Sequence, residues 1–307
     1  MTPIIYFDEA QHKYTDDRCN TYTSVTTVLA KYCNEFNTDK VALACERIGR
    51  NPLHPKYIKY KGMTATQIKA MWNSITVTAL ENGTEKHDYL EDIIKKGTGY
   101  RTVEGTDFIQ DRLFTIEDIL NKQYGELDFN WFTTSGIAFR YPIIYNAILI
   151  LHNAGFKFYA EIGVYNIELL ISGKIDLLAV KDDKFIIIDW KTNKADIRFE
   201  SGYFEKDIEG NLTSNYIHTN TFMKYPLHFL SDSTGNHYNL QVSGYAWLIE
   251  QFGFTNLGNI IFQIRESNEL VEKIDRIELK DYREHSASMF KHHFQNRTLK
   301  PDLLLFR

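Results

Sequence analysis

The stretch that decides the fold runs from Phe156 to Trp190 and has the sequence FKFYAEIGVYNIELLISGKIDLLAVKDDKFIIIDW. Three consecutive segments within it are rich in Ile, Val, Phe and Tyr, namely Phe156 to Ile167, Leu169 to Val180 and Lys184 to Trp190. This composition is typical of β-strands. Asp182-Asp183 supplies a tight turn between the last two segments. The sequence therefore predicts three neighbouring strands at the centre of the protein.

Helical and extended patterns surround these strands. Helices are expected over 25–32 (capped by Ser24), 66–81, 84–96, 115–122, 142–152, 237–252 and 281–296, with an interruption at Asn82-Gly83. Further strands are expected over 4–7, 12–15, 257–264 and 271–279, and a loop over 51–62. The order of elements predicts an α/β or mixed α+β fold with a central mixed sheet flanked by helices.

Length and charge limit the classes of protein to consider. The 307 residues suit one elaborated domain, and the net charge of −5 argues against a general polycationic coat for nucleic acid. Three cysteines near one end, without a CxxC pair, indicate neither a disulfide framework nor a zinc ribbon. With no signal peptide and no long apolar run, we expect a soluble cytoplasmic protein that does not enter a membrane.

Acidic side chains follow the three central strands. Glu161 lies in the first, Asp176 in the second and Asp189 near the end of the third, with Lys191 two residues later on the same strand face. A hairpin between the second and third strands can bring Asp176 and Asp189 to one end of the sheet. Carboxylates beside the apolar run Phe185 to Ile188 are costly to bury unless a cation lies close to them.

Two interpretations of this acidic group are open. The aspartates offer the oxygen ligands that Mg²⁺ or Mn²⁺ prefers, and Lys191 would then stabilise charge developing on a phosphate. Alternatively, Asp189 and Lys191 form an ion pair that caps a strand.

Four short motifs in a fixed order favour the first interpretation. They are Gly83-Thr84-Glu85-Lys86-His87 with Leu90 and Glu91, Gly173-Lys174-Ile175-Asp176, Ile187-Ile188-Asp189-Trp190-Lys191-Thr192, and Gln241-Val242-Ser243-Gly244-Tyr245. As a set they resemble the PD-(D/E)XK nuclease superfamily, in its RecB-type branch with a QxxxY motif. Tyr225-Pro226-Leu227 and Leu230-Ser231-Asp232 extend the resemblance to phage exonucleases and the mitochondrial genome maintenance exonuclease.

The resemblance implies a restriction-endonuclease-like core and a role for each matched residue. His87, Asp176, Asp189 and the backbone carbonyl of Trp190 would bind the metal ion, and Lys191 would be the catalytic lysine.

Three further positions complete the implied site. Glu161 would contact a second metal ion or water. Glu168 is an alternative, but it lies an odd number of positions along the strand from Glu161, so only one of the two side chains should face the site. Gln241 and Tyr245 would contact DNA or buttress the site from one helix face.

The implied cofactor is Mg²⁺ or Mn²⁺. Some members of the branch bind an iron–sulfur cluster through four cysteines, and the lack of cysteine after Cys45 excludes that type of cluster. The chain has no GxxxxGKS or GxxxxGKT run, so no nucleotide cofactor is expected. Ile175 replaces the proline of the family motif, a common change in this branch.

The expected function is metal-dependent hydrolysis of DNA from single-stranded ends, in replication, recombination, repair or phage DNA processing. DNA is the expected partner, with replication or recombination proteins as further candidates and the host cytoplasm as the location if a phage encodes the chain. Two alternatives stay open: a structure-specific or flap endonuclease on the same core, and a DNA-binding assembly protein with a vestigial site.

The predicted organisation has an N-terminal elaboration over 1–65 and a nuclease domain over 66–307, with insertions over about 97–135 and 195–235. Lys56, Lys59 and Lys61, interleaved with Tyr57 and Tyr60, could hold phosphates and stack on bases, although a solvated loop is the favoured interpretation. The first insertion includes aromatic residues that fit either a buried core or a lid over a single strand.

Overall fold

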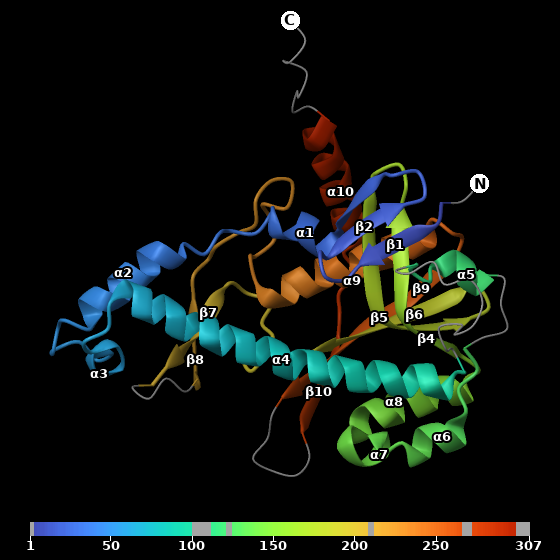
Figure 1. Ribbon diagram of the computed structural model, residues 1–307, viewed down its shortest axis with the longest axis horizontal. Helices are drawn as coiled ribbons and strands as arrows, with labels where there is room; N and C mark the ends of the chain where they lie inside the picture. The colour runs from blue at the N-terminus through green and yellow to red at the C-terminus, as the bar shows by residue number, and fades with distance from the viewer. Residues whose placement is uncertain (1–2, 100–111, 121–124, 208–211, 266–271, 299–307) are drawn as a thin grey trace, which may run out of the picture.

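The computed structural model describes residues 3–99, 112–120, 125–207, 212–265 and 272–298. Its centre is a mixed sheet of eight strands in the order β1-β2-β3-β5-β6-β9-β10, with β4 paired to β5 off this path (Figure 1). The strands are β1 (Ile5–Asp8), β2 (Lys13–Asp16), β3 (Thr21–Ser24), β4 (Lys157–Asn166), β5 (Ile171–Lys181), β6 (Lys184–Lys191), β9 (Thr255–Arg265) and β10 (Lys273–Glu278). The expected mixed α/β architecture is confirmed.

The predicted strands form where their composition indicates. The three central strands, the N-terminal hairpin and the two late strands all begin and end within two residues of the expected positions. Asp182 adopts a left-handed conformation, with φ of 52°, in the turn between β5 and β6. The sequence did not predict β3, a four-residue strand that pairs in parallel with the start of β5.

Strand β5 has a forked edge. β4 pairs along most of one edge, whereas the other edge pairs with β3 at Ile171 and Ser172 and with β6 from Leu177 to Lys181. Residues 173–176 lie between these two partners. The fork therefore leaves this short stretch of β5, which includes Asp176, without a partner strand on that edge.

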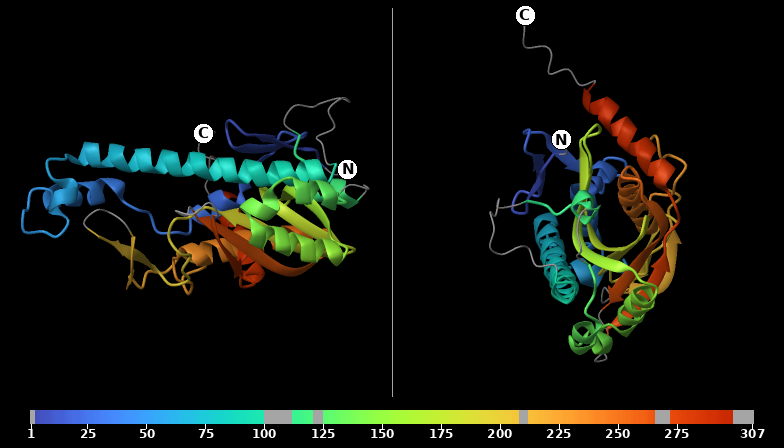
Figure 2. Two further views of the ribbon diagram at one scale, coloured as in Figure 1. Left: turned by 90° about the horizontal axis from the view of Figure 1, so that it is seen from below. Right: turned by 90° about the vertical axis from the view of Figure 1, so that its right-hand side faces the viewer.

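Helices cover both faces of the sheet (Figure 2). They are α1 (Val25–Ala30), α2 (Thr38–Ile48), α3 (Tyr57–Tyr60), α4 (Ala65–Gly97), α5 (Ile116–Leu120), α6 (Phe129–Thr134), α7 (Ile137–Arg140), α8 (Pro142–Asn153), α9 (Thr234–Glu250) and α10 (Arg283–Thr298). The predicted cap is present, because the Ser24 side chain accepts a hydrogen bond from the Thr27 amide at 3.0 Å.

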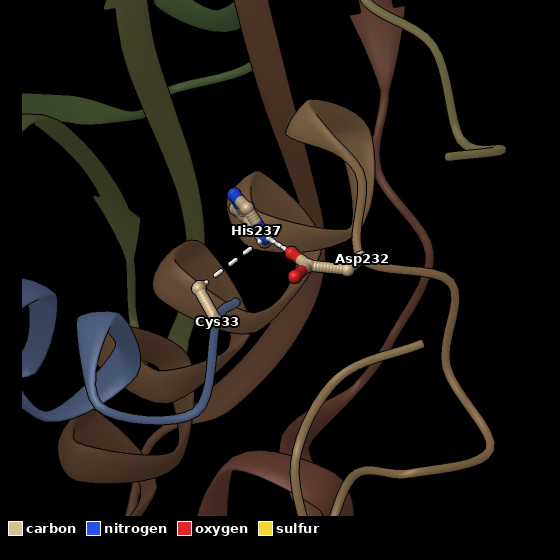
Figure 3. Close-up of side chains that lie close together, drawn as sticks. All are labelled: Cys33, Asp232 and His237. Carbon is tan, nitrogen blue, oxygen red and sulfur yellow. Dashed lines mark hydrogen bonds and ion pairs between the residues drawn. The ribbon is translucent and has the colours of Figure 1, made fainter. Parts of the chain in front are cut away.

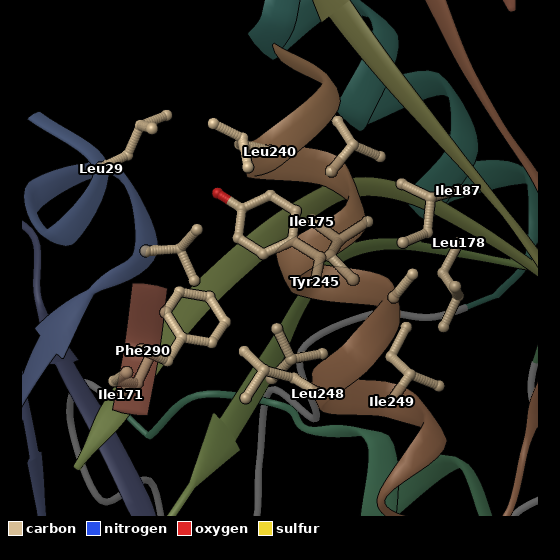
Figure 4. Close-up of a cluster of buried hydrophobic side chains, with 14 of the residues drawn as sticks. Leu29, Ile171, Ile175, Leu178, Ile187, Leu240, Tyr245, Leu248, Ile249 and Phe290 are labelled. Carbon is tan, nitrogen blue, oxygen red and sulfur yellow. The ribbon is translucent and has the colours of Figure 1, made fainter. Parts of the chain in front are cut away.

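The two helical layers bury separate cores against the sheet. On one face α9 packs with α1, α10 and the central strands, as Figure 4 shows for Leu240, Tyr245 and Leu248 above Ile175 and Ile187. On the other face, α4 and α8 pack their apolar side chains against the opposite side chains of β4, β5, β6 and β9. No helix of the described ranges is long and apolar enough to cross a membrane.

Helix α4 corrects one prediction. The expected break at Asn82-Gly83 is absent, and a single helix of 33 residues begins at the Thr64 capping box and continues to Gly97. Gly83 is buried, and a Cβ built on it would lie 3.0 Å from Oγ1 of Thr192. The glycine therefore allows the helix to approach the end of β6 closely instead of ending it.

The N-terminal half of α4 projects beyond the sheet with α2 and α3, and we call these three elements the arm (Figure 2). A small core of its own, centred on Ala42, Cys45, Tyr60 and Ile68, holds the arm together. The predicted loop over 51–62 contains α3, so that prediction was incomplete.

The two predicted insertions also carry regular structure. Residues 195–235 were expected to be irregular, but they include an antiparallel hairpin of β7 (Gly202–Lys206) and β8 (Leu212–His218) beside the arm (Figures 1 and 2). Residues 97–135 contain the expected short helix as α5, together with α6, which was not predicted. The predictions for 100–111 and 121–124 lie outside the described residues.

Candidate active site

The register of the sheet places three carboxylates in one row. Ala160 pairs with Leu177 and Ile162 with Ile175, so Glu161 lies opposite Asp176. Between β5 and β6 the ladder ends at Leu177 with Ile188, so Asp176 and Asp189 are the residues immediately beyond the last pair, at the fork. Residues directly opposite each other in antiparallel strands share a face. The candidate site is therefore a row of acidic residues across β4, β5 and β6, at the fork in the sheet.

A bend in β4 lies at Glu161. This residue has a φ of 57°, which non-glycine residues rarely adopt. Side chains of a regular strand point alternately to the two faces of the sheet, but this alternation shifts by one residue at Glu161. Tyr159 and Ile162, three positions apart, both point into the core beneath α9. Glu168 is exposed in the turn after β4, so of the two glutamates considered, Glu161 is the one beside Asp176.

Helix α4 brings His87 to this row. Its Nδ1 atom lies 3.5 Å from Oδ2 of Asp176, and its ring interacts with the backbone of Trp190. Burial lowers the pKa of His87, and this effect outweighs the opposing influence of Asp189. The imidazole is therefore neutral at neutral pH, the form in which histidine binds a metal ion.

Asp189 and Lys191 form a close pair inside the sheet. Asp189 is only 2% exposed, and its Oδ2 atom lies 2.6 Å from Nζ of Lys191. Burial alone would lower the pKa of Lys191, but the charges of Asp189 and Asp176 raise it overall. The lysine therefore stays protonated at neutral pH and provides a fixed positive charge beside the carboxylates.

The other two carboxyl groups are poorly compensated. Burial, and then the charge of Asp189, raises the pKa of Asp176 to about 7. Burial likewise raises the pKa of Glu161 to about 7, against the opposing effect of its ion pair with Lys174. When all three carboxyl groups are ionised, the site therefore carries more negative charge than its two lysines neutralise. A bound divalent cation would neutralise the excess.

The donor set fits a hard cation in chemistry but does not yet converge on one point. Carboxylate, carbonyl and imidazole groups surround the fork, and the buried Oδ2 of Asp189 and Oε2 of Glu161 each lie against a lysine ammonium group. However, Asp189 faces Lys191, and of the predicted ligand pairs only His87 and Asp176 approach within ion-pair distance in the described structure. A cation between Asp176 and Asp189 would therefore share the negative charge of Asp189 with Lys191.

Gln241 and Tyr245 lie behind the row on α9. Gln241 donates a hydrogen bond from Nε2 to the hydroxyl of Tyr245 at 3.1 Å. Tyr245 is 4% exposed and lies in the core between α9 and the sheet (Figure 4). Its ring fills the space above Gly173, where a Cβ would come within 2.5 Å of Cε1. Of the two roles expected for this tyrosine, its burial favours support of β5 over contact with DNA.

Sequence reasoning missed two residues at the site. Tyr238 on α9 lies with its ring 5.0 Å from Nζ of Lys191 and donates a hydrogen bond to Oδ1 of Asn193 at 2.6 Å. Lys174 pairs with Glu161 and lies over the Phe7 ring at 5.2 Å. The spacing of both residues could have indicated their place at the site. Lys174 precedes Asp176 by two positions on one strand, and Tyr238 precedes Gln241 by three on one helix, so each pair shares a face.

Comparisons with known proteins give distant structural similarity alone. No family model matches the chain, and no curated protein matches its sequence. A candidate exonuclease from Eubacterium rectale shares 15% identity at a TM-score of 0.34, over 71% of this chain and 65% of its own length. The protein SSO0001 shares 14% identity at a TM-score of 0.26, over 74% of this chain and 89% of its own. Similarity at this level does not establish a common activity, so any functional conclusion depends on the geometry of the site itself.

Proposed function

We propose that the protein is a metal-dependent nuclease that hydrolyses phosphodiester bonds of DNA from single-stranded ends. The observation that carries the proposal is the row of Glu161, Asp176 and Asp189 on three adjacent strands, with Lys191 and His87 against it. Buried acidic groups in such numbers destabilise a fold unless they serve a cation or a reaction. The motif resemblance supports the choice of a phosphodiester as substrate.

In this proposal, the residues at the fork have different roles in hydrolysis. Asp176, Asp189, His87 and the Trp190 carbonyl would hold Mg²⁺ or Mn²⁺, which polarises the phosphate and lowers the pKa of a bound water. Lys191, kept protonated by its acidic neighbours, would stabilise negative charge developing on the phosphate oxygens. Glu161 has a pKa of about 7 and so is suited to accept a proton near neutral pH.

Positive charge on the arm suggests where DNA approaches. Burial, and then the charges of Lys206 and Lys56, lowers the pKa of Lys59, so the hairpin and the arm bring their lysines near each other. A bound polyanion reduces the repulsion between such neighbouring positive charges, and the phosphates of a DNA strand would form this polyanion. Tyr60 is buried in the core of the arm, which leaves the half-buried Tyr57 as the aromatic residue for base stacking at this patch.

The direct test uses linear DNA labelled at one end. With Mg²⁺ or Mn²⁺ the purified protein is expected to release labelled nucleotides or short oligonucleotides, and excess EDTA is expected to stop the reaction. Asp189→Asn removes the most buried carboxylate of the row at nearly constant shape, while Asp183→Asn changes an exposed aspartate in the neighbouring turn. Cleavage that survives EDTA or Asp189→Asn at the wild-type rate would exclude this function for the site.

A further inference from the structure

A second group of donor side chains converges at the start of α9, separate from the carboxylate row. Cys33 follows α1, Asp232 lies just before α9, and His237 lies in the first turns of that helix (Figure 3). Within the ranges that the structure describes, this is the one group of three His, Cys, Asp or Glu residues whose donor atoms all lie within 4.8 Å of one another.

Both neighbours meet the same nitrogen of the histidine. Nε2 of His237 lies 3.3 Å from Sγ of Cys33 and 2.6 Å from Oδ1 of Asp232. A catalytic Cys–His–Asp relay needs the cysteine and the acid on opposite ring nitrogens, so that one orients the ring and the other loses a proton. Convergence on one nitrogen is instead the arrangement of ligands that face a common point.

The geometry of these side chains therefore does not support a nucleophilic role for the cluster.

We propose that Cys33, Asp232 and His237 form a binding site for a zinc-type divalent ion, with a water molecule as the fourth ligand. Sulfur, imidazole nitrogen and carboxylate oxygen together match Zn²⁺ and not Mg²⁺, which takes oxygen ligands. Tetrahedral zinc at its usual bond lengths separates sulfur and nitrogen ligands by about 3.5 Å, close to the 3.3 Å between Cys33 and His237. The contact between His237 and Asp232 has to open by somewhat less than ~1 Å to admit the ion.

A neighbouring residue holds the carboxylate in position. Asn34 donates to Oδ2 of Asp232 twice, from its backbone amide at 2.7 Å and from Nδ2 at 2.6 Å. The other oxygen of Asp232 is left to face the histidine. Metal-binding carboxylates are commonly oriented by such outer hydrogen bonds, so the cluster has an outer support as well as three ligands.

The ion would connect parts of the chain that are far apart in sequence. It would fasten the end of α1 to the start of α9, one residue before Tyr238, whose ring contacts Lys191. We therefore assign it a structural role, holding the start of α9 against the candidate active site. This assignment stands whether or not the carboxylate row is a nuclease site.

Cobalt is the probe that distinguishes this site from the carboxylate row. Titration of the full-length, reduced, metal-free protein with Co²⁺ is expected to give sulfur-to-cobalt charge-transfer absorption that saturates at one ion per chain and that Zn²⁺ displaces. Asp189→Asn should leave this signal unchanged, because the carboxylate row has no sulfur ligand. Cys33→Ser should abolish it, whereas Cys19→Ser, which alters an exposed free cysteine, should not.

Two further measurements guard against loss of folding in the ligand variants. Asn34→Ala keeps all three ligands and is expected to weaken Zn²⁺ binding by roughly 10–100-fold, as loss of outer support does at other sites. Zn²⁺ should also raise the melting temperature of the wild type and of Cys19→Ser but not of Cys33→Ser. Absence of the sulfur-to-cobalt signal in the wild type, or its persistence in folded Cys33→Ser, would overturn the proposal and leave a hydrogen-bonded cluster.

Discussion

The ammonium group of Lys191 lies 2.6 Å from Oδ2 of Asp189, two residues earlier on the same strand. In the described structure the lysine thus pairs with one of the two carboxylate oxygens that Asp189 would offer to a metal ion at the fork. The ion and Lys191 therefore share the charge of Asp189, and substitutions at these two positions are expected to separate metal binding from charge stabilisation.

Asp189→Asn is expected to abolish cleavage and to weaken Mg²⁺ or Mn²⁺ binding while the protein remains folded. The change removes a charge at almost constant volume, and the amide oxygen can still accept a hydrogen bond from Lys191. Calorimetry with Mn²⁺ measures the binding, circular dichroism monitors the fold, and Asp183→Asn is the matched exposed control. Unchanged Mn²⁺ binding in folded Asp189→Asn would remove this aspartate from the metal site.

Lys191→Ala is expected to lower the cleavage rate by about 10²-fold or more, the usual scale for loss of an electrostatic stabiliser. Metal binding should persist, since the substitution removes no ligand and frees Oδ2 of Asp189. Lys184→Ala, at the exposed start of the same strand, is the control. If metal binding disappears while cleavage remains high, the roles of Lys191 and its neighbours are reversed.

The sequence predicted the part of the site that depends on short-range order. Strand composition and the turn at Asp182-Asp183 determine that β5 and β6 pair, and the hairpin register brings Asp176 and Asp189 to the same end of these strands, just beyond the pair of Leu177 with Ile188. The helix that carries Gln241 and Tyr245 was likewise evident from its periodicity. Local patterns sufficed in these cases because each element is long and rich in apolar residues, and because β5 and β6 are adjacent in sequence.

Features that depend on contacts between distant parts of the chain could not be predicted from the sequence. Gly83 was interpreted as a helix end, although its role is set by Thr192 on a distant strand. β3 has four residues and little apolar character of its own, and its place depends on the forked edge of β5. The cluster of Cys33, Asp232 and His237 joins residues about 200 positions apart, and no spacing rule for metal ligands identifies such a set.

Gly173→Ala is expected to destabilise the protein by about 1–3 kcal/mol, the usual cost of overpacking a filled core. The new methyl group would meet the Tyr245 ring, and the displacement would reach Asp176 three residues along β5, so the cleavage rate should fall as well. Chemical denaturation measures the stability. In the double variant with Tyr245→Ala the two effects should be less than additive, and full additivity would show that glycine and ring are not in contact.

The stability of the metal-free protein should depend on pH through Asp176. Its pKa is raised to about 7 in the folded state, so between about pH 4 and pH 7 the folded protein holds a proton that the unfolded chain has lost. The free energy of unfolding should therefore fall as pH rises through this window, by at most about 1.4 kcal/mol per pH unit from this group, and level off above it.

Asp176→Asn isolates that contribution. Urea denaturation in EDTA at several pH values is expected to give a smaller slope for this variant than for the wild type, while Asp183→Asn keeps the wild-type slope. Saturating Mg²⁺ should reduce the slope of the wild type, because bound cation favours the ionised carboxylate. Identical slopes for the wild type and Asp176→Asn in EDTA would contradict the raised pKa.

Closed circular single-stranded DNA is expected to resist the enzyme under conditions that degrade the same sequence in linear form. The arm and the β7–β8 hairpin lie beside each other, and their lysines, including Lys59 and Lys206, offer a path for a single strand that is entered from an end. Lys59→Ala and Lys206→Ala should therefore weaken binding of linear DNA, and more at low salt, because each would remove one of the proposed phosphate contacts. Lys157→Ala, on β4 and away from the arm, is the control.

Equal cleavage rates on circular and linear single-stranded DNA would refute the exonuclease proposal and favour an endonuclease at the same fork. Cleavage of neither substrate, with DNA still bound, would favour a binding protein whose acidic row no longer acts on phosphates.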